Sequence, residues 1–150
     1  MKTVSAALVT LCLVAGAAGA DDNLLTVYPA DGDFDDATFA VESAITDRGL
    51  VIDFVSHVGA MLSRTGADVG SSQPIFEQAD IFLFCSAVVS RQVMEADPDN
   101  IAHCPYGIFV WEFPGPDGTV EIGFRNMPGD AMATVQALLD AIAKEAAGID

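Results

Sequence analysis

Apolar and polar positions alternate along the chain in blocks that predict a succession of strands and helices. Short apolar runs rich in β-branched and aromatic residues predict five strands, at residues 24–29, 50–57, 79–87, 106–113 and 118–125. Apolar residues spaced three and four apart predict four helices, at residues 31–49, 58–70, 87–96 and 130–148. The order β-α-β-α-β-α-β-β-α predicts an α+β domain in which helices pack on one face of a mostly antiparallel or mixed sheet.

Turn and capping residues support these boundaries. Asp33 is a predicted N-cap followed by acidic residues in the first helical turn, and Gly49 is expected just beyond the last turn. Ser86 is a predicted N-cap for the helix that follows it. The segment "PGPDG" at 114–118 predicts a hairpin between the last two strands.

The same pattern predicts which residues are buried. The nearly continuous apolar segment 79–87 predicts a strand in the middle of the sheet. Phe109, Trp111 and Phe113 alternate along one face of a strand and are expected to belong to the core. The last helix carries an apolar stripe that is expected to cover the sheet, formed by Met132, Val135, Leu138, Leu139 and Ile142.

The first twenty residues have the three parts of a secretory signal peptide. Lys2 supplies a positive charge, "VSAALVTLCLVAGA" an apolar segment, and "AGA" small residues before Asp21. The apolar run is short for a membrane span, and no basic cluster follows it. We therefore expect residues 1–20 to be cleaved, residues 21–150 to form one domain, and the protein to be periplasmic or secreted.

Charge narrows the range of partners. The chain carries a formal charge of −16, and without Lys2 five basic residues remain against 22 acidic ones, a charge of −17. Such a surface repels phosphate backbones and anionic lipids, so we expect no nucleic-acid binding and no membrane insertion after signal cleavage. A small ligand or a periplasmic protein partner is compatible with it, and acidity by itself also keeps exported proteins soluble.

Familiar catalytic motifs are missing from the sequence. It contains no C-x-x-C-H haem attachment site, C-x-x-C redox pair, G-x-S-x-G elbow, phosphate loop or H-E-x-x-H helix. Beyond the predicted signal peptide the only lysine is Lys144, which disfavours Schiff-base and phosphoryl-transfer chemistry. The sequence therefore favours a non-enzymatic role without establishing one.

Two cysteines, Cys85 and Cys104, remain once Cys12 leaves with the predicted signal peptide. An even pair in an oxidising compartment favours a disulfide, which at this spacing would contribute about 3 kcal/mol in the chain-entropy model. Cys85 precedes a predicted helix N-terminus, where the pKa of a thiol can be lowered, which suits a nucleophile or a ligand. It also shares strand parity with Ile81 and Leu83, so a buried partner is equally natural. A disulfide, a ligand or redox pair, and two buried thiols all stay open.

His57 is a further candidate ligand, at a predicted strand-to-helix corner. Met61 follows four residues later, and an H-x-x-x-M pair on one helix face is typical of soft-metal or haem ligands. Haem or copper is therefore a candidate cofactor, held by His57 with Cys85 and Cys104. His103, next to Cys104, is expected to be incidental.

Four segments of the chain, quoted in the next sentence, also resemble a known family, the domain of unknown function 302. The resemblance covers residues 24–127 and rests on "RGLVI", "DFVSHVGAML", "FCSAVVSRQVMEADPDNIAHCPYGIFVWE" and "GFRNMP". It implies an α+β fold with helices packed on a sheet, and an exported, cysteine-containing branch of the family, because other branches lack the first cysteine. No activity is implied. The family's motif positions are matched here by His57, Cys85, Cys104, Pro105, Tyr106 and Arg125.

Three functions follow from these residues. A binding module would place His57 within a few ångströms of a cysteine sulfur beside a pocket, with Met61, Tyr106 and Arg125 as further ligand-binding candidates. A thiol–disulfide or sulfur-handling protein would expose the Cys85/Cys104 pair in a bondable arrangement. A structural or interaction domain would bury a relaxed disulfide far from His57. The binding module is the first hypothesis and the thiol–disulfide protein the second.

Overall fold

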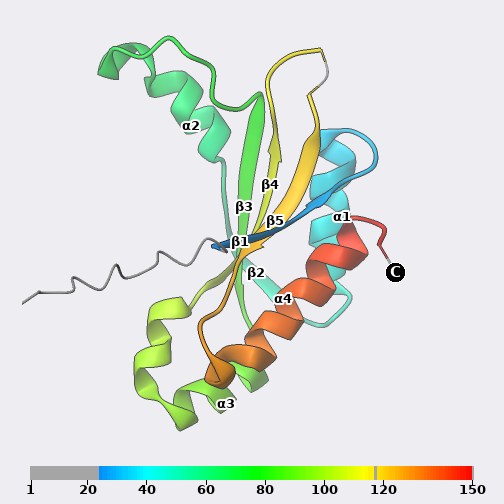
Figure 1. Ribbon diagram of the computed structural model, residues 1–150, viewed down its shortest axis with the longest axis vertical. Helices are drawn as coiled ribbons and strands as arrows, with labels where there is room; N and C mark the ends of the chain where they lie inside the picture. The colour runs from blue at the N-terminus through cyan, green and yellow to red at the C-terminus, as the bar shows by residue number, and fades with distance from the viewer. Residues whose placement is uncertain (1–23, 117, 150) are drawn as a thin grey trace, which may run out of the picture.

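Five strands form one antiparallel sheet in the computed structural model of the protein, which describes residues 24–116 and 118–149 (Figure 1). The sheet order is β1-β5-β4-β3-β2, and all four neighbouring pairs are antiparallel. The predicted α+β class is therefore confirmed, as is the interior place of β3. The strands are β1 (Leu25–Pro29), β2 (Val51–Ser56), β3 (Gln78–Cys85), β4 (Tyr106–Glu112) and β5 (Val120–Arg125).

Four α-helices connect and follow the strands in the described chain: α1 (Phe34–Thr46), α2 (Val58–Thr65), α3 (Ala87–Ala96) and α4 (Ala133–Ala146). Short 3₁₀ turns lie at Ala67–Val69, Pro98–His103 and Asp130–Met132. Both predicted N-caps are confirmed. The Asp33 carboxylate accepts a hydrogen bond from the backbone N–H of Asp36 at 2.9 Å, and the Ser86 hydroxyl accepts one from that of Val89 at 3.3 Å.

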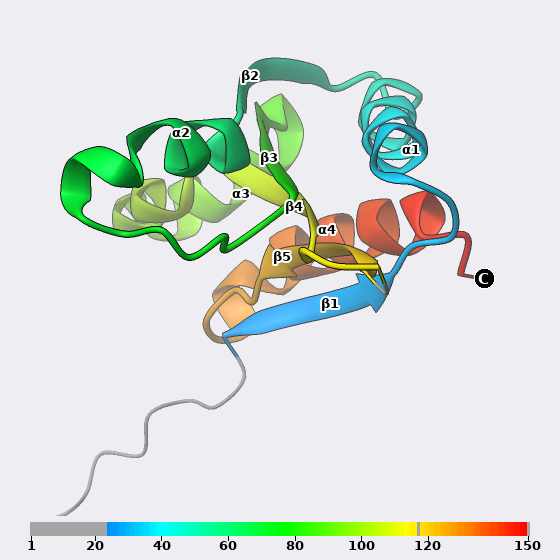
Figure 2. The ribbon, with the colours of Figure 1, turned by 90° about the horizontal axis from the view of Figure 1, so that it is seen from above.

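The main core lies between one face of the sheet and the helices α1 and α4 (Figure 2). Val41 and Ile45 of α1 are fully buried there, as are Leu139 and Ile142 of α4. The predicted stripe on the last helix is confirmed, although Leu138 is only partly buried. The strands contribute the even-numbered residues Phe82, Phe84, Tyr106, Ile108, Val110, Ile122 and Phe124.

Helix α2 departs from the expected one-sided arrangement. It lies against β3 on the face of the sheet turned away from α1 and α4 (Figure 2). The contact is close because α2 carries Gly59: a Cβ added there would stand 2.5 Å from the backbone nitrogen of Ala79. Because glycine has no Cβ, the backbone of α2 can approach the strand here more closely than any other residue at this position would allow.

The expectation that Phe109, Trp111 and Phe113 belong to the core is wrong. Phe109 pairs with Ile81 and Trp111 with Ala79, on the face opposite the main core. Phe113 is 42% exposed. The segment 106–113 is apolar on both strand faces, so its alternation could not show which face the helices cover.

The predicted signal peptide and its cleavage site before Asp21 lie outside the described residues. Among the helices of residues 24–116 and 118–149, none combines the length and the apolar character that crossing a bilayer requires.

Candidate functional site

Cys85 and Cys104 meet at one end of the sheet. Cys85 is the last residue of β3, directly before the N-cap of α3. Cys104 ends the 3₁₀ turn after α3 and, through a cis bond to Pro105, leads into β4. Since β3 and β4 pair with Phe84 opposite Tyr106, the antiparallel register brings the end of β3 beside the start of β4. Both cysteines are free thiols and both are half-buried.

The environment of Cys85 disfavours its thiolate. Partial burial raises the pKa of Cys85 from 9.0 to about 12, helped by a side-chain hydrogen bond with the Cys104 thiol and by the negative charges of Cys104 and Asp53. The backbone N–H of Tyr106 acts in the opposite direction by donating to the sulfur. Of the two environments weighed from the sequence, burial beside a partner thiol therefore governs the pKa of Cys85, and the helix N-terminus does not lower it below the ordinary value.

Two hydroxyl groups extend the thiol pair toward the core. The Ser90 hydroxyl on α3 donates to the phenolic oxygen of Tyr106 at 3.1 Å and lies 4.0 Å from the sulfur of Cys104. Tyr106 is 1% exposed, and burial raises the pKa of its phenol, as do the charges of both cysteines, against the lowering effect of the Ser90 hydrogen bond. The site thus consists of two adjacent thiols with a hydrogen-bonded Ser–Tyr pair behind them.

His57 is not part of this site. It caps α2, and its Nδ1 atom lies 2.8 Å from the Oδ1 atom of Asp80, near the start of β3. Figure 1 shows α2 and α3 at opposite ends of β3, which separates His57 from Cys85 by most of that strand. The haem or copper site expected from His57, Cys85 and Cys104 together is therefore not formed. In the described part of the chain, no three His, Cys, Asp or Glu side chains cluster in a way that could hold a metal ion.

The other candidate ligands are also scattered. Met61 lies on α2, 40% exposed, and its sulfur accepts a hydrogen bond from Thr65 at 3.8 Å. Arg125 ends β5, where it is exposed and pairs with Leu25 of β1. Of the residues proposed from the sequence, the structure brings together only Cys85, Cys104 and Tyr106.

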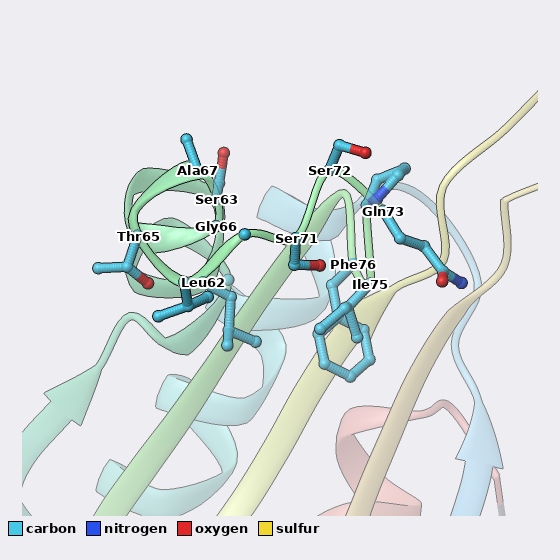
Figure 3. A pocket seen from close by; sticks show the side chains of 14 residues that line it. Leu62, Ser63, Thr65, Gly66, Ala67, Ser71, Ser72, Gln73, Ile75 and Phe76 are labelled. Atoms are coloured by element: carbon cyan, nitrogen blue, oxygen red, sulfur yellow. The ribbon is translucent and has the colours of Figure 1, made fainter.

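Two hollows lie near α2, toward the end of β3 opposite the thiols. The first, about 590 Å³, is enclosed by α2 and the segment that returns from it to β3, with Leu62, Ile75 and Phe76 labelled on its wall in Figure 3. The second, about 400 Å³, lies over the sheet itself. Phe76 lines both, so the two hollows are neighbours.

Comparison with known proteins agrees with this fold. The family model described as "Domain of unknown function DUF302" matches residues 26–148. The chain belongs to this family. A solved structure described as an uncharacterized conserved DUF302 protein from Bacillus stearothermophilus superposes with a TM-score of 0.65 at 15% identity, covering 83% of this chain and 98% of that one. At that identity the likeness concerns the fold alone. Among the curated proteins, none matches this chain.

Within this DUF302 chain, sequence reasoning missed Ser90 and Asp80. Ser90 is one serine on an amphipathic helix, and nothing local distinguishes it from a solvent-facing residue. Asp80 stands near the start of an apolar strand, where an acidic residue is interpreted as marking the end of the preceding loop. Ser90 becomes visible only when the position of α3 sets it beside Tyr106, and Asp80 only when the pairing of β2 with β3 sets it beside His57.

Proposed function

We propose that this DUF302 protein is exported and that its Cys85/Cys104 pair works as a reversible thiol–disulfide couple. One observation carries the proposal: two cysteines 19 positions apart in the sequence stand together as half-buried thiols that hydrogen-bond each other. A couple of this kind needs sulfurs that can bond without large backbone movement and that a partner can reach. The arrangement matches the second of the three functions set out from the sequence.

Export is supported by the sequence alone. Residues 1–20 carry a positive start, an apolar segment and small residues before Asp21, the order that secretory signals share. In the periplasm or outside the cell, thiol pairs meet oxidants that the cytosol keeps away from them. The proposed compartment and the proposed chemistry therefore support each other.

The two thiols take different parts in the exchange. Cys104 as thiolate attacks an external disulfide, so that a mixed disulfide forms and one partner thiol leaves. Cys85, after giving up its proton, attacks the Cys104 sulfur and releases the second partner thiol. The two cysteines lose two protons and two electrons, and the partner disulfide is reduced to two thiols. Cys85 suits the second step because its raised pKa keeps it protonated until the mixed disulfide stands beside it.

The test is a redox titration of the exported protein. The full chain is collected from the periplasm of a Gram-negative host, equilibrated in glutathione buffers of graded ratio, quenched with an alkylating reagent and weighed by mass spectrometry. We expect one transition from two alkylated thiols to a protein lacking two hydrogens and both labels. In Cys85→Ser, Cys104 should accumulate a mixed disulfide with glutathione, and in Cys104→Ser the capture by Cys85 should be much slower.

Three results would overturn the proposal. A disulfide that concentrated dithiol leaves intact in the folded protein would indicate a structural bridge. Thiols that stay reduced in oxidised glutathione would indicate no couple at all. Copper bound one per chain and lost in Cys85→Ser would indicate a soft-metal site on the same two sulfurs.

A further inference from the structure

The face of the sheet opposite the main core is apolar although α1 and α4 do not cover it. On β3 it carries Ile81 and Leu83, and on β4 Phe109 and Trp111, all of them only partly buried. On β1 it carries Leu25, 41% exposed. Helix α2 contributes Val58 to its border and the segment before β3 contributes Phe76; we call this surface the open face. It is a sheet surface of the kind that is usually buried against something.

Two glycines give the open face a flat floor. A Cβ at Gly123 would stand 3.0 Å from the Cη2 atom of Trp111, and one at Gly107 would stand 3.2 Å from the Cε1 atom of Phe109. The rings of Trp111 and Phe109 therefore pack directly on the backbone at these two glycines, where a side chain would keep them at a distance. Above these rings lies the hollow of about 400 Å³.

The lining of this hollow selects for an apolar body. Its volume is in the range of small-molecule sites. Asp80 is the one ionisable residue among those that line it, and its carboxylate is already bonded to His57 at 2.8 Å. The other lining residues are all apolar and include Leu25, Ile81, Phe109 and Trp111. Such a lining offers dispersion contacts and almost no hydrogen bonds, so it favours hydrocarbon or an aromatic ring.

Arg125 supplies a charge at the rim. It pairs with Leu25, which lines the hollow, and stands on the same face of the sheet. Within the described residues, Arg48, Arg91 and Lys144 each form an ion pair with a carboxylate, whereas Arg64 and Arg125 form none, and of these two only Arg125 pairs with a residue that lines the hollow. The exposed guanidinium of Arg125 presents its N–H donors in a planar fork that matches the two oxygens of a carboxylate, so the attraction is local and acts against the overall negative charge of the chain. Glu121, opposite Trp111 on β4, adds negative charge farther along β5 and so disfavours the reverse orientation.

We propose that the open face binds a small amphipathic carboxylate, with its apolar body over Trp111 and Phe109 and its carboxylate on Arg125. The site is separate from the thiol pair at the end of β3. It gives a role to the aromatic residues of β4 that the core does not use, and to Arg125.

Trp111 makes the test direct, because it is the one tryptophan of the chain. Decanoate, decanol and decyltrimethylammonium are titrated below their micelle concentrations while the intrinsic fluorescence of the full-length protein is recorded. We expect a saturable change with decanoate at a dissociation constant about tenfold below that for decanol, and no saturable change with the cationic probe, since one guanidinium–carboxylate bond is worth roughly that factor.

Matched variants decide which residues hold the probe. Arg125→Gln should raise the dissociation constant for decanoate to that for decanol, while Arg91→Gln, the same change on α3, should leave it unchanged. Leu25→Glu should abolish binding, while Val88→Glu, the same kind of change at a 78% exposed site, should not. Circular dichroism confirms that each variant is folded.

Other outcomes refute the proposal. They are an unresponsive Trp111, equal affinity for all three probes, or an Arg125→Gln protein that binds decanoate normally. Sedimentation showing a stable dimer that Leu25→Glu dissociates would assign the open face to a second copy of the chain. Cys85→Ser and Cys104→Ser should bind decanoate normally, so failure here and failure of the thiol–disulfide couple are distinguishable.

Discussion

The chemical reactivity of Cys85 follows from its place at the end of β3. At pH 8 a thiol with a pKa of 9.0 is about one-tenth thiolate, whereas one with a pKa of about 12 is thiolate in about one molecule in ten thousand. The fraction falls about a thousandfold. A more basic thiolate is a better nucleophile, and a Brønsted slope of about 0.4–0.5 recovers roughly 16- to 32-fold over three pKa units. We therefore expect Cys85 to be alkylated roughly 30- to 60-fold more slowly in the folded protein than in the unfolded chain.

Trypsin makes this measurable without mutation, because Arg91 lies between the two cysteines. The peptide 65–91 carries Cys85 and the peptide 92–125 carries Cys104. Reduced protein is pulsed with iodoacetamide at graded pH, unfolded, labelled with the heavy reagent and digested, and the same peptides from protein unfolded in guanidinium serve as the reference. The rate for Cys85 should keep rising about tenfold per pH unit through pH 10, whereas the reference flattens above its pKa.

A second variant separates the causes of the raised pKa. Cys104→Ala removes the hydrogen-bonding and charged neighbour but not the burial, so the alkylation of Cys85 should become faster yet stay slower than in the unfolded chain. The sign for stability follows from the same shift. Since the pKa of Cys85 is higher in the folded protein than in the unfolded chain, the contribution of its protonated thiol to the stability of the fold is fully present below pH 9. That contribution is lost as the pH rises toward 12. A rate for Cys85 that levels off near pH 9, or equals the unfolded rate, would refute the reasoning.

Two further substitutions test the fold around the sites. Gly123→Ala should lower the free energy of unfolding by about 1–3 kcal/mol, and with it the melting temperature by several degrees, because its Cβ would stand 2.8 Å from a backbone carbonyl oxygen of β1. A calorimetric transition at the original temperature would contradict this close packing. Asp140→Asn should cost about 1 kcal/mol at pH 7, because Asp140 accepts a hydrogen bond from Tyr28 at 2.5 Å and pairs with Lys144 at 2.8 Å. These partners lower the pKa of Asp140, so its contribution is present above pH 4 and lost as the pH falls further; urea unfolding at several pH values checks this, with Asp68→Asn as the control.

Most of the fold could be predicted from local patterns. The helix caps at Asp33 and Ser86 depend on side chains that bond within three residues, so they are legible in the sequence alone. The interior position of β3 follows from its continuous apolar run. The stripe on α4 is equally local, because its period of 3.6 residues defines one face whatever the helix packs against.

The candidate site could be predicted only in part. The strand ends could be located, so the proximity of Cys85 and Cys104 was among the expected arrangements. The partner of His57 depended on the direction in which α2 leaves β2. That direction places His57 beside Asp80, at the end of β3 opposite Cys85. The pKa of Cys85 depended on burial and on a second thiol, neither of which has a local signal.

The sequence by itself determined the elements, their caps and the α+β class, because these depend on residues close together in the chain. The tertiary structure decided which face of a strand became the inside. In the segment 106–113 both faces are apolar, and only the packing of α1 and α4 on the even-numbered residues assigned Ile108 to the core and left Trp111 on the open face. It also decided that the thiols meet each other and not His57, because strand register, which arises from long-range pairing, sets the distance between residues far apart in the chain.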